Sequence, residues 1–131
     1  MDNTNIVFDH VHIISKDPES AATWYVEKLD GKIINCQEVR GAPQVVVAFG
    51  DITIIVRGQR PGEEVVTGQG MKWGTDHFGF RVEGDFDGFC DDLKEKGVTF
   101  SLDPVDFTPN IRIAFIDAPD EVSIELLQRK E

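Results

Sequence analysis

Two histidines, His10 and His77, stand near the start of two segments that look like copies of each other, residues 10–31 and residues 77–97. Imidazole is the commonest metal ligand among protein side chains. Because the duplication puts the two imidazoles in equivalent places, the sequence predicts that they bind one divalent metal ion together.

Glu125 is the third candidate ligand, and it lies between Ile124 and Leu126 in an expected strand. An unpaired carboxylate in the middle of a partly buried strand is costly, and metal coordination removes that cost. If both segments curve their polar faces toward a common cleft, Glu125 converges there with His10 and His77. Two imidazoles and one carboxylate leave coordination positions open for substrate and water, and Fe(II), Mn(II), Zn(II) and Ni(II) all suit this ligand set.

The elements that must position these side chains follow from hydrophobic periodicity and from helix start signals at Asp17 and Asp85. Each copy is predicted to fold as a βαβββ module. The expected strands cover residues 6–15, 32–39, 43–49, 51–57, 73–83, 98–102, 111–116 and 121–127, and the expected helices end at Gly31 and Gly97. The prediction is an α+β fold in which residues 1–131 form a single domain with a cleft-shaped mixed sheet. Module one covers about residues 6–57, a linker covers 58–72, and module two covers about 73–128.

Other polar residues share the faces of the candidate ligands, because alternate residues of a strand point to the same side. His12 lies on the face of His10, where it is expected to act as an acid or base, as an alternative ligand, or as a hydrogen-bonded wall residue. Arg57 is predicted to contact a carboxylate or phosphate of the substrate, or to reach solvent. Arg112 joins this face if its neighbours Ile111, Ile113 and Phe115 pack under the helix.

Composition excludes several other classes of function. The chain has 131 residues, of which 40% are apolar and 28% are charged, as in an ordinary globular domain. Its net charge of −11 argues against binding to nucleic acid. Because neither a long apolar run nor a leader-like start is present, we expect a cytoplasmic protein that does not bind membranes. Cys36 and Cys90 lack metal or redox spacing and are expected to be reduced thiols.

The order and spacing of the motifs resemble the vicinal oxygen chelate superfamily. This superfamily includes glyoxalase I, extradiol dioxygenases, methylmalonyl-CoA epimerase, fosfomycin-resistance thiol transferases and drug-binding proteins. The resemblance runs from about Ile6 to Gln128. Its motifs are Asp-His10-Val-His-Ile, Asp17-Pro, Trp-Tyr25, Leu-Asp-Gly31, Asp-His77-Phe-Gly-Phe, Gly97-Val, Ala-Pro119-Asp and Ile124-Glu125-Leu.

The resemblance implies a metal in a cleft formed by the paired modules, with His10, His77 and Glu125 as its ligands. The family's fourth ligand position falls on Ile55, where glyoxalase I carries a glutamate that is both ligand and base. Isoleucine can do neither, so the sequence departs from glyoxalase I at this position. A set of three ligands remains, as in the dioxygenases and the thiol transferases.

The resemblance implies a divalent-metal-dependent, glyoxalase-like lyase or isomerase. It would act by Lewis-acid chelation of a small substrate with neighbouring oxygens. His12 and Glu125 would be its catalytic residues and Arg57 would bind the substrate. One alternative is an extradiol-type dioxygenase that uses the same two histidines and carboxylate. A second alternative is a non-catalytic protein that sequesters a drug or metabolite. Family members often pair, so a homodimer is also expected.

Overall fold

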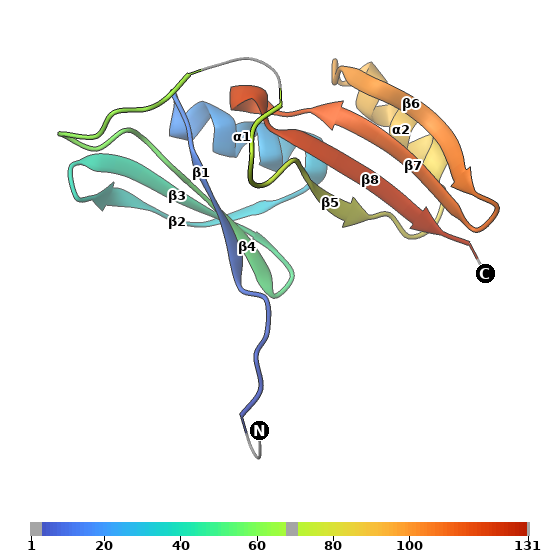
Figure 1. Ribbon diagram of the computed structural model, residues 1–131, viewed down its shortest axis with the longest axis horizontal. Coiled ribbons are helices and arrows are strands. Elements are labelled where there is room, and N and C mark those ends of the chain that lie inside the picture. Colours follow the sequence, from blue (N-terminus) through green and yellow to red (C-terminus); the bar gives the residue numbers. More distant parts are fainter. Residues whose placement is uncertain (1–3, 68–70, 131) are drawn as a thin grey trace. The chain divides into compact units, whose positions relative to one another are not determined.

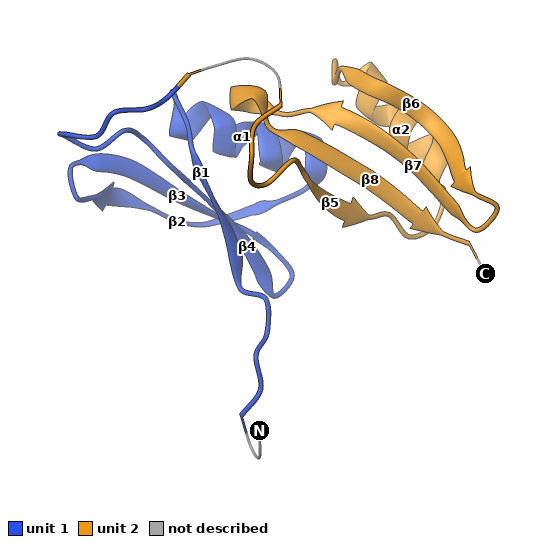
Figure 2. Cartoon of the chain, in the orientation of Figure 1, with its two compact units in different colours: residues 1–66 blue, residues 67–131 orange. Residues whose placement is uncertain are grey.

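The computed structural model describes residues 4–67 and 71–130, and the chain divides into two units, residues 1–66 and 67–131 (Figures 1 and 2). Unit 1 contains β1 (His10–Ile14), α1 (Pro18–Leu29), β2 (Lys32–Val39), β3 (Ala42–Phe49) and β4 (Ile52–Arg57). Unit 2 contains β5 (Phe78–Arg81), α2 (Phe86–Glu95), β6 (Phe100–Thr108), β7 (Ile111–Asp117), the 3-10 helix η1 (Pro119–Glu121) and β8 (Ser123–Arg129). The predicted α+β fold of two βαβββ modules is therefore confirmed.

The expected boundaries between the modules are only partly covered by the described residues. Residues 68–70 of the expected 58–72 linker lie outside them. The single domain over residues 1–131 stays a prediction. None of the described helices is long and apolar enough to span a membrane.

The two sheets have the same topology, with strand orders β1-β4-β3-β2 and β5-β8-β7-β6. In each unit the first strand pairs in parallel with the last, and the remaining neighbours are antiparallel. The registers are also equivalent, since His12 lies opposite Ile55 as Gly79 lies opposite Glu125. The register therefore puts Ile55 where the predicted alignment of the modules has it, in the place of Glu125.

Alternation along the strands builds a core on one face of each sheet. In unit 1, α1 packs on β3 and β4, and Ile54 and Val56 are buried as predicted. The prediction for Ile52 is wrong, because this residue begins β4 next to a turn and is exposed. In unit 2, Ile124 and Leu126 are fully buried. Each such side chain stabilises the fold by roughly 1.5–3 kcal/mol.

Both helices begin as predicted, with an aspartate at the N-cap. The Asp17 carboxylate accepts a hydrogen bond from the Ser20 N–H at 3.2 Å, and the Asp85 carboxylate accepts one from the Gly88 N–H at 3.0 Å. Each bond satisfies a backbone donor that the first helical turn leaves without a partner. The caps thus fix where the chain turns from the first strand of a module into its helix.

The end of the first helix differs from the prediction. The left-handed residue that ends α1 is Asp30, with a φ of 64°, and not Gly31. Gly31 is needed for a different reason, because a Cβ there would lie 2.6 Å from Cγ1 of Val47. In unit 2, Gly97 does take the left-handed conformation after α2, with a φ of 84°.

Three strands differ most from their predicted bounds, and most of the others differ by one or two residues at an end. The first and fifth are shorter, since β1 begins at His10 and β5 covers only Phe78–Arg81. Their only strand partners among the described residues are β4 and β8, and the parallel ladders begin at the pairs of His10 with Thr53 and of Phe78 with Ile124. The apolar residues before β1 and β5 therefore stay outside the sheets. In contrast, β6 extends beyond residue 102 because it forms a long hairpin with β7.

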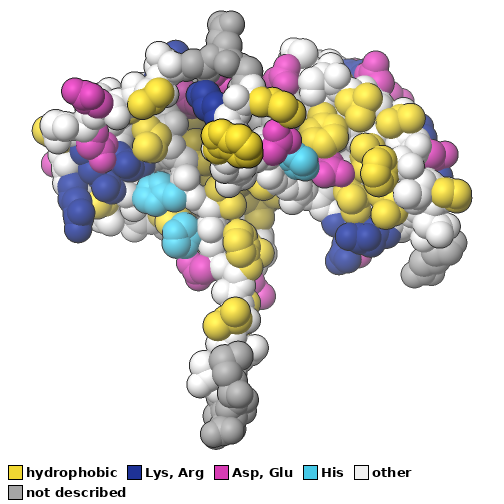
Figure 3. All heavy atoms as spheres, in the orientation of Figure 1, with side chains coloured by type: hydrophobic (Ala, Val, Ile, Leu, Met, Phe, Trp, Pro, Cys, Tyr) yellow, Lys and Arg dark blue, Asp and Glu magenta, His cyan; other side chains and the backbone are white. Residues whose placement is uncertain are grey.

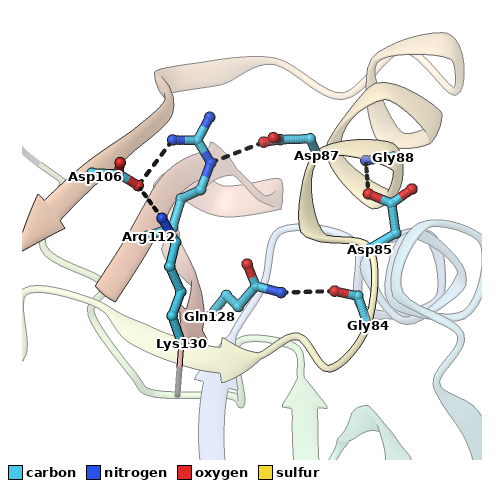
Figure 4. Close-up of polar contacts among 8 residues, drawn as sticks. All are labelled: Gly84, Asp85, Asp87, Gly88, Asp106, Arg112, Gln128 and Lys130. Carbon is cyan, nitrogen blue, oxygen red and sulfur yellow. Dashed lines mark hydrogen bonds and ion pairs between the residues drawn. The ribbon is translucent and has the colours of Figure 1, made fainter. Parts of the chain in front are cut away.

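Arg112 lies on the helix-covered face of unit 2, so the condition under which it would share the face of Glu125 is not met. Its Nε donates to Asp87 of α2 at 3.0 Å, and its Nη1 donates to Asp106 of β6 at 3.1 Å (Figure 4). The residues that alternate with it on β7, Ala114 and Ile116, are completely buried. Arg112 therefore ties the helix to the sheet, away from the candidate ligands.

Candidate metal centre

His77 and Glu125 come together within unit 2. Gly79 lies opposite Glu125 in the parallel ladder, so His77, two residues earlier, lies diagonally across from Glu125 on the same face. The Nε2 atom of His77 is 3.0 Å from Oε1 of Glu125. The side chains retain 30% and 21% of their exposure, so the pair is accessible without being fully solvated.

Asp76 orients the imidazole from its other side. Its Oδ2 lies 2.8 Å from Nδ1 of His77, and the ring of Phe115 lies edge-on at a centroid distance of 4.9 Å. The hydrogen bond with Asp76 is the main cause that raises the pKa of His77. Glu125 raises this pKa further, and burial opposes both. A carboxylate that accepts the Nδ1 proton leaves Nε2 as the ligand nitrogen, which is the usual arrangement behind a metal-bound histidine.

Unit 1 repeats the arrangement only in part. His10 has the same partner as His77, since its Nδ1 lies 2.7 Å from Oδ2 of the preceding residue, Asp9. Ile55 occupies the place equivalent to Glu125 and offers no ligand atom. Within either unit, the described side chains form no group of three or more possible metal ligands. The convergence of His10 with the pair in unit 2 stays a prediction.

The residues of unit 2 fit a divalent ion. Donor atoms that each lie about 2.1 Å from one ion, at roughly right angles, are about 3 Å apart. His77 Nε2 and Glu125 Oε1 form a hydrogen bond of 3.0 Å, and this distance is also the spacing of two ligands of one ion. A neutral imidazole and a carboxylate also suit Fe(II), Mn(II), Zn(II) and Ni(II). Asp76 supplies the outer support that such a ligand needs.

His12 and Arg57 lie on the same face of unit 1. Burial is the largest cause that lowers the pKa of His12, and the positive charges of Arg57, Arg60 and His10 add to it. The imidazole rings of His10 and His12 are 6.2 Å apart. Figure 3 shows two neighbouring histidines beside a group of dark blue basic side chains over unit 1. The guanidinium of Arg57 pairs with Glu63, Nη1 to Oε1, at 2.5 Å.

Four residues that contact the candidate site residues or adjoin them were not predicted from the sequence: Asp9, Asp76, Arg60 and Glu63. Asp9 and Asp76 had a visible signal, because an Asp-His pair occurs at the start of both copies. Arg60 and Glu63 had a weaker one, the dipeptide Pro61-Gly62 between them, which favours a tight turn. The turn brings the Glu63 side chain to Arg57 and the Arg60 side chain to Gln44.

A cavity of about 850 Å³ in unit 2 adjoins the candidate ligand pair through Asp76, the partner of His77. Asp76 lines it, but His77 and Glu125 do not. The other described lining residues are Met71, Lys72, Thr75, Asp117, Ala118, Asp120, Glu121, Val122 and Ser123. Its carboxylates face mostly solvent, and we assign no function to it.

Solved structures of low sequence identity have the same fold. One is a glyoxylase/bleomycin resistance protein/dioxygenase domain from Frankia sp. EAN1pec, with a TM-score of 0.78, 21% identity, and coverage of 98% of this chain and 95% of the other. A second is TnmS3, an antibiotic binding protein from Streptomyces sp. CB03234, with a TM-score of 0.73, 22% identity, and coverage of 96% and 98%. A third is the trypanothione-dependent glyoxalase I of Leishmania major, with a TM-score of 0.73, 21% identity, and coverage of 95% and 87%.

The comparison with curated proteins gave no match. A family model does match, and it covers residues 7–126, nearly the whole chain. The duplicated module, the shared register and the solved structures agree with this match. The chain belongs to the Glyoxalase/Bleomycin resistance protein/Dioxygenase superfamily, the vicinal oxygen chelate group that its motifs resemble.

Proposed function

We propose that this protein is a divalent-metal-dependent lyase or isomerase of the glyoxalase-like class. Its substrate would be a small molecule with two neighbouring oxygens. The ligands would be His77, Glu125 and His10, and the metal would be Fe(II), Mn(II), Zn(II) or Ni(II). A divalent ion held there would supply Lewis-acid stabilisation of negative charge that develops on a substrate oxygen.

The 3.0 Å approach of His77 Nε2 to Glu125 Oε1 carries this proposal. Three features support it. Asp76 and Asp9 hold Nδ1 of the two candidate ligand histidines in the same way. The pair is partly accessible, as a site that admits a substrate must be. The chain also belongs to a superfamily that includes dioxygenases and glyoxalases.

The remaining residues of the proposed site handle the substrate. His12 shares the strand face of His10 and is the proposed base that takes a proton from the substrate carbon and returns one. Glu125 is proposed to be catalytic as well as a ligand, because a carboxylate bound to the ion would lie next to the substrate oxygens that bind the same ion. Arg57 is the proposed substrate contact. Ile55 supplies no carboxylate, so proton transfer cannot use the position that glyoxalase I uses.

Metal binding is the first test. Protein purified without chelators would be analysed for metal and then titrated with Mn(II), Zn(II) and Ni(II), and anaerobically with Fe(II). We expect one ion per chain, and loss of binding in His77→Ala and Glu125→Gln. Glu83→Gln is the matched control, because Glu83 is an exposed glutamate of the same unit. Normal metal binding by His77→Ala would overturn the ligand assignment.

Proton transfer is the second test. A small α-hydroxyketone such as hydroxyacetone has neighbouring oxygens and an exchangeable carbon-bound proton. The metal-loaded protein is expected to catalyse exchange of that proton for deuterium in D₂O, observed by NMR, and His12→Ala is expected to lose most of this activity while still binding metal. Absence of exchange together with oxygen uptake on catechols would favour the dioxygenase instead.

A third outcome would favour a protein without catalytic activity. If the chain binds no metal and catalyses no exchange, a sequestering function is favoured, since TnmS3 is an antibiotic binding protein with this fold. We also propose a homodimer, which sedimentation of the purified chain would test directly. A monomer at all concentrations would contradict that part.

A further inference from the structure

Arg57 is satisfied by a carboxylate that its own chain supplies. Its side chain keeps only 12% of its exposure, and Nη1 contacts Oε1 of Glu63 at 2.5 Å. The backbone N–H of Arg60 donates to the same oxygen at 2.8 Å. These bonds, together with the charge of Arg60, lower the pKa of Glu63 and keep it ionised. One carboxylate oxygen is thus held by a guanidinium and a backbone amide, as a bound carboxylate would be.

A four-residue turn delivers this carboxylate. The Glu63 N–H donates to the Arg60 carbonyl at 3.1 Å, and Gly62 between them has a φ of 84°. This is the hydrogen bond and the positive φ of a type II turn, with Pro61 and Gly62 in the central positions that favour it. Glu63 therefore sits on a short connection outside the sheet.

The same place contains a cationic donor that the protein does not use. The Nε atom of Arg60 is buried and has no hydrogen-bond partner among the described residues. Its Nη2 has only a long contact, 3.4 Å, to Oε1 of Gln44. A buried donor without an acceptor is costly. A ligand oxygen would remove that cost.

This cluster adjoins the polar face of unit 1. Arg57 lies opposite Gln44 on β3 and opposite Ile14 on β1, two residues beyond His12 on the same face. A molecule held by Arg57 and Arg60 would therefore extend along β1 toward His12. The face of β1 can therefore accommodate a substrate whose carboxylate and reacting group are separated by a few atoms.

We propose that Arg57, Arg60 and Gln44 form a carboxylate-binding subsite, and that Glu63 occupies it until a substrate carboxylate displaces it. The protein's substrate would then be a small organic acid, whose neighbouring oxygens lie at the other end. The assignment of the subsite to the substrate rests on the proposed function. The subsite itself is independent of metal and is tested on metal-free protein.

Propanoate is the probe, since it reproduces the Glu63 side chain from Cβ outward. Metal-free Glu63→Gln would be titrated by ¹H–¹⁵N NMR, alongside wild type and Glu64→Gln. Glu64 is the next residue, it is exposed, and its variant has the same net charge. Freed from its internal competitor, Glu63→Gln is expected to bind propanoate at least roughly tenfold more tightly than the other two proteins. Equal affinity of Glu63→Gln and Glu64→Gln would overturn the proposal.

Variants of Arg57 in the Glu63→Gln background identify the binding group. Arg57→Gln is expected to abolish propanoate binding, and Arg57→Lys, which keeps the charge and loses the planar fork, to weaken it. If Arg57→Gln does not fold, Arg57→Lys still tests the proposal. Unchanged propanoate affinity in Arg57→Lys would show that the planar guanidinium of Arg57 does not bind the carboxylate. Uncharged propanamide is expected not to bind. Tighter binding of phosphate than of propanoate would overturn the carboxylate class.

Because these titrations contain no metal, they separate the two proposals. If Glu63→Gln binds propanoate tightly but the protein binds no metal, the subsite is supported and the proposed metal-dependent function is contradicted. If the protein binds metal but all variants bind propanoate with equal affinity, the metal site is supported and the subsite is contradicted.

Discussion

Asp9 and Asp76 each hold the Nδ1 edge of the histidine that follows, at 2.7 Å and 2.8 Å. A carboxylate in this position fixes the ring and makes Nε2 a better ligand, and its loss typically lowers metal affinity 10- to 100-fold. We therefore expect Asp76→Asn to weaken metal binding roughly tenfold or more. Competition with a chromophoric chelator measures the affinity.

Asp51→Asn is the control for this prediction. Asp51 is exposed and lies in the turn before β4, so its loss changes the net charge by the same amount. If Asp76→Asn and Asp51→Asn have equal metal affinities, Asp76 does not support a ligand.

The two cysteines are expected to differ sharply in reactivity. Cys36 is exposed, whereas Cys90 lies on the buried face of α2. Burial raises the pKa of Cys90 to about 11, and only the thiolate reacts rapidly with disulfide reagents. One thiol per native chain should therefore react with Ellman's reagent at pH 8, and two in denaturant. Cys36→Ser should abolish the fast reaction, and a fast native reaction of that variant would contradict the buried state of Cys90.

At the level of single residues, the sequence predicted what depends on neighbours along one strand. Glu125 and His77 were placed on one face by alternation, and the parallel register then brought them within 3.0 Å. Glu63 was not predicted, because its contact with Arg57 depends on how a turn folds back over the sheet. The face of Arg112 stayed undecided in the sequence for a related reason. When both faces of a strand carry apolar residues, as in β7, the sequence does not show which face packs against the helix.

Among the elements, α2 offers a direct test of local stability. The Asp85 carboxylate caps its first turn by accepting from the Gly88 N–H at 3.0 Å (Figure 4). Asp85→Ala should lower the free energy of unfolding by about 1 kcal/mol, measured by urea denaturation. Asp92→Ala, an exposed acidic position of the same helix, is the control and should be nearly neutral. Equal stability of the two variants would show that the cap contributes nothing.

Element types were easier to predict than element ends. The helices begin at the predicted caps, because an aspartate before the first turn is a local signal. The ends of β1 and β5 were predicted wrongly, since β-branched or aromatic residues continue past the point where the partner strand stops. Strand length is decided by the neighbour in the sheet, and a single segment does not contain that information.

Across the whole molecule, duplication accounts for the fold and leaves two positions at which the copies differ in their polar side chains. The two modules share topology, caps and register. The sequence predicted this architecture because the same motifs recur in the same order. The alignment of the copies also predicted where they differ, and the register agrees, since His12 has glycine as its counterpart and Glu125 has isoleucine.

Ile55 is the position where one of these differences can be reversed. It lies diagonally across from His10 as Glu125 lies across from His77, and it is only partly buried. A carboxylate there should therefore reach Nε2 of His10 without the cost of a fully buried charge. If His10 is a metal ligand, Ile55→Glu adds a fourth ligand and should tighten metal binding by roughly tenfold or more.

Ile55→Gln separates coordination from the other effects of this change. It has nearly the same shape and polarity as Ile55→Glu, and it carries no negative charge to attract a cation. Calorimetric titration with Zn(II) and Mn(II) should therefore give tighter binding for Ile55→Glu than for either wild type or Ile55→Gln. Adding His10→Ala should remove the gain, because the new carboxylate would have lost the ligand beside it. If the gain survives without His10, the charge attracts the ion on its own, and the equivalence of the two modules does not extend to their ligands.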